Sequence, residues 1–219
     1  MGINHVEPGG APLVARLSGS VTMIKVSVGP MDNNAYLLQR PAGGSVLIDA
    51  ANDQDRLLKI IADLPLDVIV TTHRHDDHWQ ALPSVAAATG ARLICGQPDL
   101  DAIREGAWVQ GLIGVWDGDQ IELGAERLEV IGLVGHTPGS ITLGYVGAGR
   151  THLFTGDSLF PGGPGRTTTP EDFTSVMNDL ESKIFDRFGD DTVVHPGHGD
   201  DTTLGTERPH LGEWRTRGW

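Results

Sequence analysis

The chain has 219 residues, of which 39% are hydrophobic, enough for one sizeable core, so a single domain over residues 1–219 is expected. Its 30 glycines and 13 prolines follow no Gly-X-Y period and form no low-complexity tract, which excludes the collagen-like and disordered classes. With 16 basic and 29 acidic side chains the formal net charge is −13, which argues against nucleic acid as a partner.

The sequence shows no sign of a membrane span or a secretory signal. No run approaches the roughly 18 apolar residues that a membrane span requires. The first 20 residues lack the basic start and continuous apolar stretch of a signal peptide. We therefore expect a cytoplasmic protein without a membrane partner, with an N-terminal extension over residues 1–20 and a short C-terminal tail over residues 200–219. The single cysteine, Cys95, has no His or Lys beside it and is expected to be a buried structural thiol.

The first half of the chain predicts hairpin-linked strands followed by two strand–helix–strand units. Apolar, β-branched segments separated by turn residues predict strands at residues 21–28, 35–39 and 45–48. Asn52 or Asp53 then caps a helix whose apolar residues recur at helical spacing, and a strand at 68–70 follows. A second helix is predicted from about His78 to Thr89, ended by Gly90, with a strand at 92–94. The apolar residues of the first helix are Leu57, Leu58, Ile60, Ile61 and Leu64.

The second half repeats the alternation of strands and helix. Strands are predicted at residues 120–123, 128–134, 141–146, 153–155 and 193–194. Thr169 and Pro170 begin a helix that Gly189 ends. Its apolar face consists of Phe173, Val176, Met177, Leu180 and Ile184. Two sheets packed face to face, with helices on both outer surfaces, would bury all these faces, so we predict a four-layer αββα sandwich of mixed α/β class.

The strongest chemical signal follows the predicted strand at 68–70. There the segment His73-Arg74-His75-Asp76-Asp77-His78 places four candidate metal ligands within six residues. Residues two apart in an extended segment point the same way, so His73 and His75 can serve one cation, while the turn into a helix re-aims Asp77 and His78. One loop can thus serve two metals. Three further candidates follow strands beside glycines, namely His136, Asp157 and His198.

These residues resemble the full ligand set of the metallo-β-lactamase fold superfamily. The sequence motifs around these residues resemble most closely those of the glyoxalase II-like hydrolases, which act on hydroxyacylglutathione. The motifs are Gly-His-Thr-Pro-Gly-Ser, Phe-Thr-Gly-Asp-Ser-Leu-Phe and Pro-Gly-His-Gly. The resemblance extends from Val21 to Gly199 and implies the same αββα fold. It also implies the ligands: His73, His75 and His136 on one metal, Asp77, His78 and His198 on the other, with Asp157 bridging.

Two departures from the family pattern affect the substrate. Small residues usually follow the Asp-His pair, whereas Trp79 follows here, so we expect the indole to narrow the pocket. Glyoxalase II enzymes also carry a C-terminal helical domain that helps to bind glutathione, while this chain ends about twenty residues after His198. The resemblance therefore does not carry glutathione specificity over to this chain. Arg166, in a glycine-rich stretch, is a candidate to hold an anionic substrate group, with a solvated surface arginine as the alternative.

Asp49 ends the strand at 45–48 and is a candidate to orient a ligand histidine, with a simple turn role as the alternative. The remaining histidines, His5, His152, His195 and His210, are expected to have structural or surface roles. Two divalent ions would lower the pKa of a bridging water toward neutrality. Asp77 would accept a hydrogen bond from the resulting hydroxide and aim it at a carbonyl carbon. Zinc is the expected metal, and these nitrogen and oxygen ligands also accept iron or manganese.

A thioester is the expected small-molecule substrate, because a thiolate with a thiol pKa near about 8.5 leaves without strong protonation. A β-lactamase is disfavoured by Asp157 in the bridging place, and a transfer-RNA nuclease by the net charge of −13. A lactonase usually adds a tyrosine over the metals, for which only Tyr36 and Tyr145 are available. The strongest alternative is a persulfide dioxygenase with one iron, which would leave part of the ligand set unused. A non-catalytic, metal-stabilised binding protein is a further, less favoured alternative. The acyl group, the thiol and the oligomeric state stay open.

Overall fold

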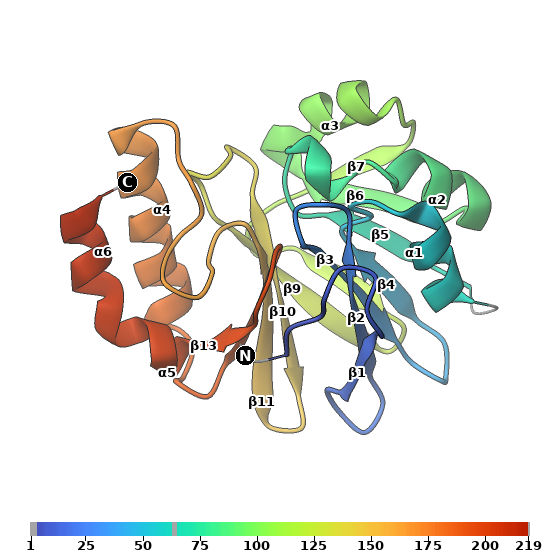
Figure 1. Cartoon of the computed structure of the whole chain (residues 1–219), viewed down its shortest axis with the longest axis horizontal. Coiled ribbons are helices and arrows are strands. Elements are labelled where there is room, and N and C mark those ends of the chain that lie inside the picture. The colour runs from blue at the N-terminus through green and yellow to red at the C-terminus, as the bar shows by residue number, and fades with distance from the viewer. Residues whose placement is uncertain (1–3, 63–64, 219) are drawn as a thin grey trace.

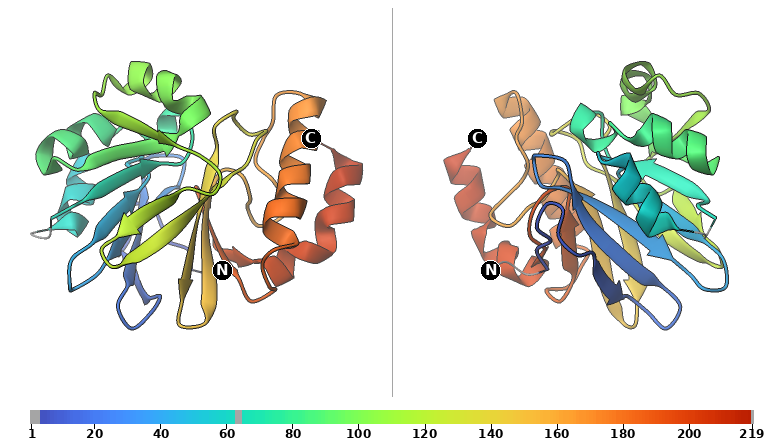
Figure 2. Two further views of the ribbon diagram at one scale, coloured as in Figure 1. Left: turned by 180° about the vertical axis from the view of Figure 1, so that it is seen from behind. Right: turned by 45° about the vertical axis from the view of Figure 1, so that its right-hand side comes forward.

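Two β-sheets pack face to face between two layers of helices (Figure 1). The computed structural model describes residues 4–62 and 65–218. Figure 2 shows α1, α2 and α3 on one outer side of the paired sheets and α4, α5 and α6 on the other. The predicted αββα sandwich is confirmed. Within the described residues, no helix is both long and apolar enough to cross a membrane.

The first sheet contains, in the described chain, seven strands in the order β1-β2-β3-β4-β5-β6-β7. Strands β1 to β4 pair antiparallel, as hairpins require, and β4 to β7 pair parallel because helices connect them. The strands are β1 Leu13–Arg16, β2 Thr22–Val28, β3 Asn33–Gln39, β4 Ser45–Ile48, β5 Val68–Thr71, β6 Arg92–Gly96 and β7 Leu112–Val115. Strand β1 therefore lies within the segment expected as an N-terminal extension.

The outer face of this sheet carries α1 Gln54–Ile61, α2 Leu82–Thr89 and α3 Leu100–Ala107. Asp53 is the N-cap of α1, and its side chain accepts a hydrogen bond from Arg56 N. Gly90, with φ of 69°, ends α2 as predicted. However, α2 begins at Leu82, because residues 76–78 form a separate 3₁₀ turn. Leu64 of the expected apolar face lies outside the described residues.

The second sheet contains, among the residues described, six strands in the order β13-β12-β11-β10-β9-β8. They are β8 Gln120–Leu123, β9 Glu126–Gly132, β10 Ile141–Gly147, β11 Arg150–Gly156, β12 Val193–Pro196 and β13 Thr202–Thr203. Strand β12 runs parallel to β11, because α4 lies between them in the chain. Their carboxyl ends therefore meet at one edge of the sheet.

Helix α4, Pro170–Asp179, begins as predicted, with the Thr169 hydroxyl accepting a hydrogen bond from Asp172 N. It continues through a π-helical turn, Leu180–Phe185, and its predicted face is buried except for the partly buried Phe173. Two short helices follow in the expected C-terminal tail, α5 Leu204–Glu207 and α6 Leu211–Arg217. They belong to the packed structure, since Trp214 of α6 is buried against the α4 layer.

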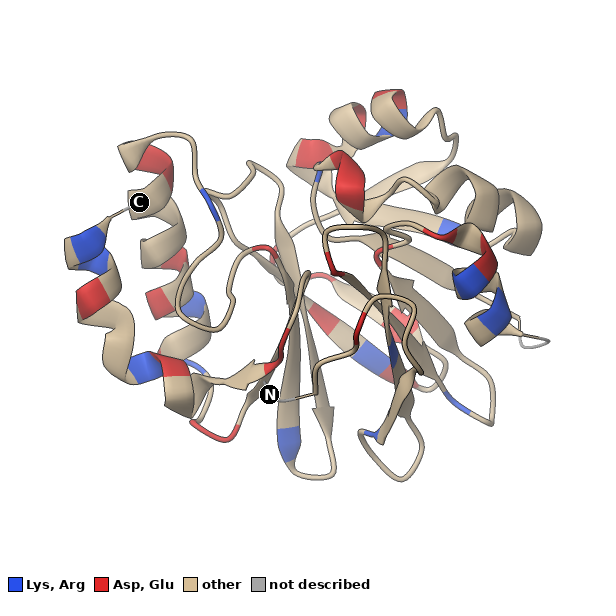
Figure 3. Cartoon of the chain, viewed as in Figure 1, with Lys and Arg blue, Asp and Glu red and all other residues tan. Residues whose placement is uncertain are grey.

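Three apolar clusters alternate with the four layers, as a sandwich of this kind requires. The central cluster joins the two sheets, for example through Met23 and Leu38 of the first and Leu143 and Phe154 of the second. Cys95 is buried in the outer cluster under α1 to α3, as expected. In Figure 3, basic residues mark outer helices, strands and loops, and acidic residues mark the helices and the loops in the middle of the molecule.

Candidate metal centre

The loop after β5 brings four of the predicted ligands to the edge of the sandwich. His73 and His78 are buried, Asp77 is half-buried and His75 is exposed. The turn at residues 76–78, closed by a hydrogen bond from His78 N to His75 O of 3.1 Å, separates Asp77 and His78 from the first two histidines. A turn thus separates the two pairs along the chain, as the spacing predicts.

Three more loops complete the cluster. His136 lies between β9 and β10, Asp157 follows β11, and His198 follows β12. Together with the first loop they form three overlapping groups, in each of which the donor atoms lie within 4.8 Å of one another. The groups are His73, His75 and His136; His73, His78 and Asp157; and Asp77, His78 and His198. All seven residues predicted from the sequence are therefore together.

The Asp157 carboxylate lies at the centre of this cluster. Its Oδ2 is 4.0 Å from His73 Nε2, 3.6 Å from His136 Nε2 and 3.5 Å from His198 Nε2, and its Oδ1 is 3.3 Å from His78 Nε2. It contacts histidines from both outer groups, which is the position that a shared ligand requires. His75 closes the first group, with its ring centroid 4.6 Å from that of His136.

Each of the four imidazoles around Asp157 has its Nδ1 atom within hydrogen-bond distance of a group outside the cluster. His136 Nδ1 donates to Arg166 O at 2.6 Å, and His198 Nδ1 donates to Met31 O at 2.8 Å. Because the acceptors are carbonyl oxygens, Nδ1 of each ring carries a proton, and Nε2 faces the cluster. Protein ligands of a metal are oriented in this way by the hydrogen bond on their other ring nitrogen.

Asp49 performs the same task for the other two histidines. Its Oδ2 accepts from His78 Nδ1 at 2.8 Å and from the Thr72 hydroxyl at 2.8 Å, and that hydroxyl lies 3.0 Å from His73 Nδ1. Asp49 has φ of 58°, in the left-handed region that non-glycine residues rarely adopt. The backbone strain at this position accompanies a carboxylate that contacts a ligand histidine, the arrangement expected for Asp49.

Burial and neighbouring charges set the protonation states of the side chains in the cluster. Burial lowers the pKa of His73 well below its usual value, and it also lowers the pKa of His136, so both rings are neutral, the form that binds metals. Burial would raise the pKa of Asp77, but hydrogen bonds with His198 and Asn33 and the charge of His78 lower it to about 2. Asp77 is therefore ionised at neutral pH.

Two buried ring nitrogens without hydrogen-bond partners indicate whether the cluster can accommodate a metal ion. Within the described residues, His73 Nε2 and His136 Nε2 are buried and form no hydrogen bond. A buried nitrogen lone pair without a donor is costly, and a divalent cation between these rings would satisfy both. The residues present therefore fit the metal ions that the sequence pattern implies.

The two predicted substrate-pocket residues lie at the margins of the cluster. The Arg166 side chain is exposed, while its carbonyl oxygen is the acceptor for His136. The Trp79 indole donates from Nε1 to Arg74 O at 3.0 Å and lies against Gly106 of α3. It is half-buried against the outer cluster beneath the helices. The contacts of Trp79 are thus on the α3 side, and its effect on a substrate stays a prediction.

Two functional neighbours were not singled out from the sequence. Asn33 donates from Nδ2 to Asp77 Oδ2 at 2.8 Å and to Asp77 O at 3.1 Å. Asp99, fully buried, accepts from Arg74 N at 3.0 Å, from Gly139 N at 3.0 Å and from the Thr137 hydroxyl at 2.6 Å. Asp99 therefore joins the loop of His73 and His75 to the loop of His136. From the sequence, Asn33 carried only a turn signal, although it is the first residue of β3.

Glycine is required where the loops meet. A Cβ atom on Gly197 would overlap Asp157 Oδ1 and lie 2.6 Å from His78 Cε1. Gly197 N donates to Gly156 O at 2.8 Å, which joins the loops after β11 and β12. The glycines noted beside the predicted ligands thus permit close approach of the backbone.

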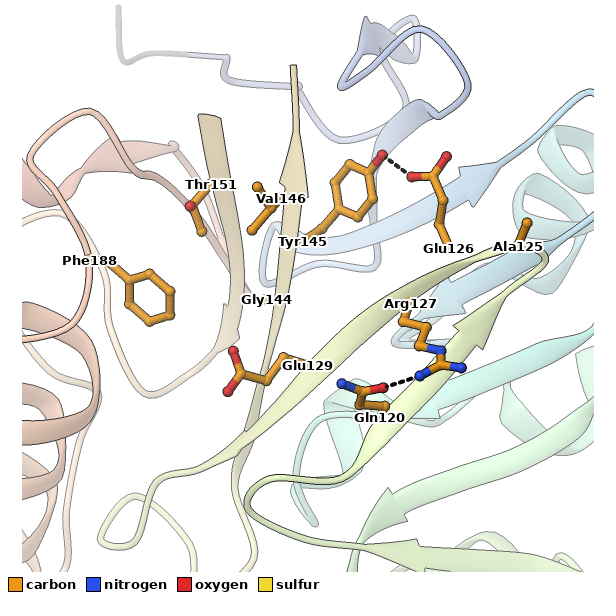
Figure 4. Close-up of a pocket in the computed structure, with 10 residues that line it drawn as sticks. All are labelled: Gln120, Ala125, Glu126, Arg127, Glu129, Gly144, Tyr145, Val146, Thr151 and Phe188. Carbon is orange, nitrogen blue, oxygen red and sulfur yellow. Dashed lines mark hydrogen bonds between the residues drawn. The ribbon is translucent and has the colours of Figure 1, made fainter. Parts of the chain in front are cut away.

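A separate depression of about 480 Å³ lies on strands β8 to β11 (Figure 4). Its lining includes Glu129, Val146 and Phe188, and hydrogen bonds join Tyr145 to Glu126 and Arg127 to Gln120. None of its lining residues belongs to the His/Asp cluster. The depression therefore takes no part in the candidate metal centre.

An αββα sandwich with this edge cluster of His and Asp defines a class of metal-binding proteins, and sequence comparison gives the family. Residues 28–198 match the family model of the metallo-beta-lactamase superfamily, and the chain belongs to that superfamily. It is 28% identical over 205 residues to hydroxyacylglutathione hydrolase GloC of Haemophilus influenzae, covering 84% of this chain and 93% of that protein. It is 35% identical over 178 residues to the hydroxyacylglutathione hydrolase of Fuscovulum blasticum, covering 76% of this chain but 62% of that protein.

Solved structures agree with this assignment. TTHA1623, in a di-iron-bound form, is similar with a TM-score of 0.69 and 29% identity over 84% of this chain and 96% of that one. ETHE1 from Myxococcus xanthus is similar with a TM-score of 0.74 and 26% identity over 89% of this chain and 84% of that one. Both of the curated relatives described above are hydrolases, which confirms the expectation of a hydrolytic enzyme.

Proposed function

We propose that this protein is a hydrolase that uses two divalent metal ions to cleave a thioester. The observation that carries the proposal is the position of Asp157, whose carboxylate contacts four Nε2 atoms at 3.3–4.0 Å from both outer ligand groups. A carboxylate shared in this way neutralises charge on two neighbouring cations. The similarity to a protein solved in a di-iron-bound form supports a site for two ions.

In this proposal His73, His75 and His136 hold one ion and Asp77, His78 and His198 hold the other, with Asp157 between them. Zinc is the first choice, and iron and manganese suit the same ligands, because nitrogen and oxygen donors without thiolate discriminate weakly among these metals. When bound, such a pair lowers the pKa of water toward neutrality and polarises a carbonyl oxygen.

The chain's own groups then position the reaction. Asp77, held by Asn33 at 2.8 Å and ionised at neutral pH, accepts a hydrogen bond from the attacking water and fixes its direction. Asn33 contacts Oδ2 of Asp77, which restricts rotation of the carboxylate. Asp49, through His78 and Thr72, keeps the ligand rings from turning as charge develops.

A thioester suits this site because its thiolate leaving group does not need to be protonated as it departs. A thiol pKa near about 8.5 lets the thiolate depart without a strong general acid. The relatives named hydroxyacylglutathione hydrolase support a thioester of this kind. The exposed Arg166 is the proposed contact for an anionic group on the substrate, and Trp79 the proposed wall of the pocket.

A persulfide dioxygenase with one iron is the second candidate. The observation in its favour is that His73, His75 and His136 form a complete group of donors without the remaining ligands. A lactonase is less favoured, because the Tyr36 hydroxyl donates to Pro196 O at 2.7 Å, while the Tyr145 hydroxyl donates to Glu126 and lies 2.8 Å from Ser18 Oγ. These hydroxyls are engaged in packing contacts and not with the ligands.

Side-by-side assays of one preparation test the proposal. The protein, reconstituted separately with zinc and with iron(II), is given a short acyl thioester, and release of thiol is followed with a thiol reagent. Oxygen uptake with a low-molecular-weight persulfide is measured in parallel. We expect thioester hydrolysis without oxygen uptake. Oxygen consumption by the iron form, with thioesters untouched by either form, would replace the hydrolase with the dioxygenase.

A further inference from the structure

A lysine lies fully buried behind the loop that carries His198. The Lys25 side chain, on β2, has no exposed area, although lysine is among the residues least often buried. Its Nζ donates to Asp201 Oδ1 at 2.8 Å, to Gly199 O at 2.8 Å and to Asn4 O at 3.1 Å. The three donors of the ammonium group are therefore all satisfied within the protein.

The partner carboxylate is equally enclosed. Asp201 Oδ2 accepts from His195 Nδ1 at 2.8 Å and from Asn4 Nδ2 at 3.1 Å, while Oδ1 pairs with Lys25. His195 belongs to β12, so the Lys25–Asp201 pair joins β2 of the first sheet to both ends of the His198 loop. The pair crosses the interface between the two sheets next to the cluster.

The same loop is held along its whole length by β3 and by the lysine. The Tyr36 hydroxyl donates to Pro196 O at 2.7 Å and Asn34 N donates to Gly197 O at 2.7 Å. Gly199 O accepts two bonds, one from Lys25 and one from Asn34 Nδ2 at 3.0 Å. The lysine thus provides the one cationic contact among these bonds, at the residue directly after His198.

We propose that the Lys25–Asp201 pair is a positioning element that fixes His198 for the second metal ion, an inference that rests on the proposed two-metal function. A buried ion pair rarely stabilises a fold more than well-packed apolar residues would, because both charges lose their hydration. The Lys25–Asp201 pair instead contributes hydrogen bonds with fixed directions. Lys25 binds the Gly199 carbonyl while Asp201 binds the strand that enters the loop, so both sides of His198 are fixed relative to β2.

The test compares Lys25→Met, which keeps the stem and removes the charge, with Lys59→Met on the exposed face of α1. Because Lys25→Met leaves Asp201 buried without its partner, the double variant Lys25→Met, Asp201→Asn supplies a neutral pair. Circular dichroism and thermal unfolding identify which variants fold. Two measurements are then made: amide hydrogen exchange of metal-free protein, and zinc titration in competition with a chelator.

Gly197 N donates to Gly156 O, and Gly199 N donates to Asp32 O. We expect exchange of these two amides to rise about tenfold or more when Lys25 is replaced, while amides of the β10–β11 hairpin keep their protection. We expect zinc affinity of the second position to fall about 10–100-fold, with the first position and the Lys59→Met control unchanged.

The possible results separate the two proposals. Wild type that binds a single zinc ion refutes the two-metal function, and the exchange data on the metal-free protein still decide the role of Lys25. If the wild type binds two zinc ions, and the Lys25 variants show unchanged amide exchange and unchanged zinc affinities, only the positioning role is overturned. Equal loss at both metal positions, or a double variant that does not fold, would show that the pair serves the fold as a whole and would also overturn it.

Discussion

The replacement Asp77→Asn tests the proposed chemistry with the smallest change in shape. It keeps an oxygen atom and a similar volume but removes the charge on Asp77. In the structure, Asp77 Oδ2 lies 2.8 Å from Asn33 Nδ2, 3.3 Å from His198 Nε2 and 3.5 Å from His78 Nε2. The carboxylate thus accepts a hydrogen bond from one amide and lies beside two imidazole rings.

The size of the effect follows from these contacts. A hydrogen bond to a charged group contributes about 1.5–3 kcal/mol, so weakening the Asn33 contact alone allows the side chain to turn. Loss of a positioned general base lowers the rate about 10²–10⁴-fold. We therefore expect kcat to fall by about 10²–10⁴, equivalent to about 2.7–5.4 kcal/mol, with a smaller change in KM, because substrate contacts lie elsewhere.

The assay is thiol release from a short acyl thioester, at metal concentrations that saturate the variant, with bound metal determined in the same samples. Asp76→Asn is the matched control, since Asp76 is the exposed neighbour in the same turn. It should retain wild-type activity. Near-normal hydrolysis by Asp77→Asn with both metals bound would refute the role given to Asp77.

Three further variants test the centre and its surroundings. Gly197→Ala should lose bound metal, because the new Cβ would overlap Asp157, whereas Gly212→Ala, with open space around it, should bind metal normally in elemental analysis. Asp157→Ala should lower zinc affinity at both positions in a chelator titration; loss at one position alone would show that the carboxylate is not shared. Burial and the charge of His195 lower the pKa of His152 to about 4, below the usual 6.5. His152 therefore stabilises the fold fully above about pH 6.5 and loses this contribution, about 1 kcal/mol after solvent screening, as the pH falls toward 4. His152→Gln should flatten that part of the pH dependence in urea unfolding; an unchanged slope would contradict it.

The loops that carry the predicted ligands could be singled out from the sequence, because their signals are local. The spacing of His73, His75, Asp77 and His78 after an apolar strand singles out these residues, and the turn at 76–78 separates the two pairs as that spacing predicts. The helix caps at Asp53, Gly90 and Thr169 were predictable for the same reason, since capping depends on residues a few positions apart.

Asp49 was singled out because it directly follows a predicted strand, whereas Asn33 and Lys25 carried no local signal and have partners that are distant in the chain. Asn33 reaches Asp77 across 44 residues, and Lys25 reaches Asp201 across 176. Such contacts follow from the register of β2 and β3 against the loops of the other sheet, which no local pattern encodes. Helix α3 was also missed: it is eight residues long and ends at Trp108 in a left-handed conformation, without the glycine that usually marks a helix end.

The number of metal ions in the active protein tests the central claim most directly. Metal-free protein would be titrated with zinc while bound metal, by elemental analysis, and thioester hydrolysis are followed in the same samples. The proposed centre predicts two ions per chain at full activity, with His73, His75 and His136 variants reducing one and Asp77, His78 and His198 variants reducing the other. Full activity with a single ion bound would contradict it.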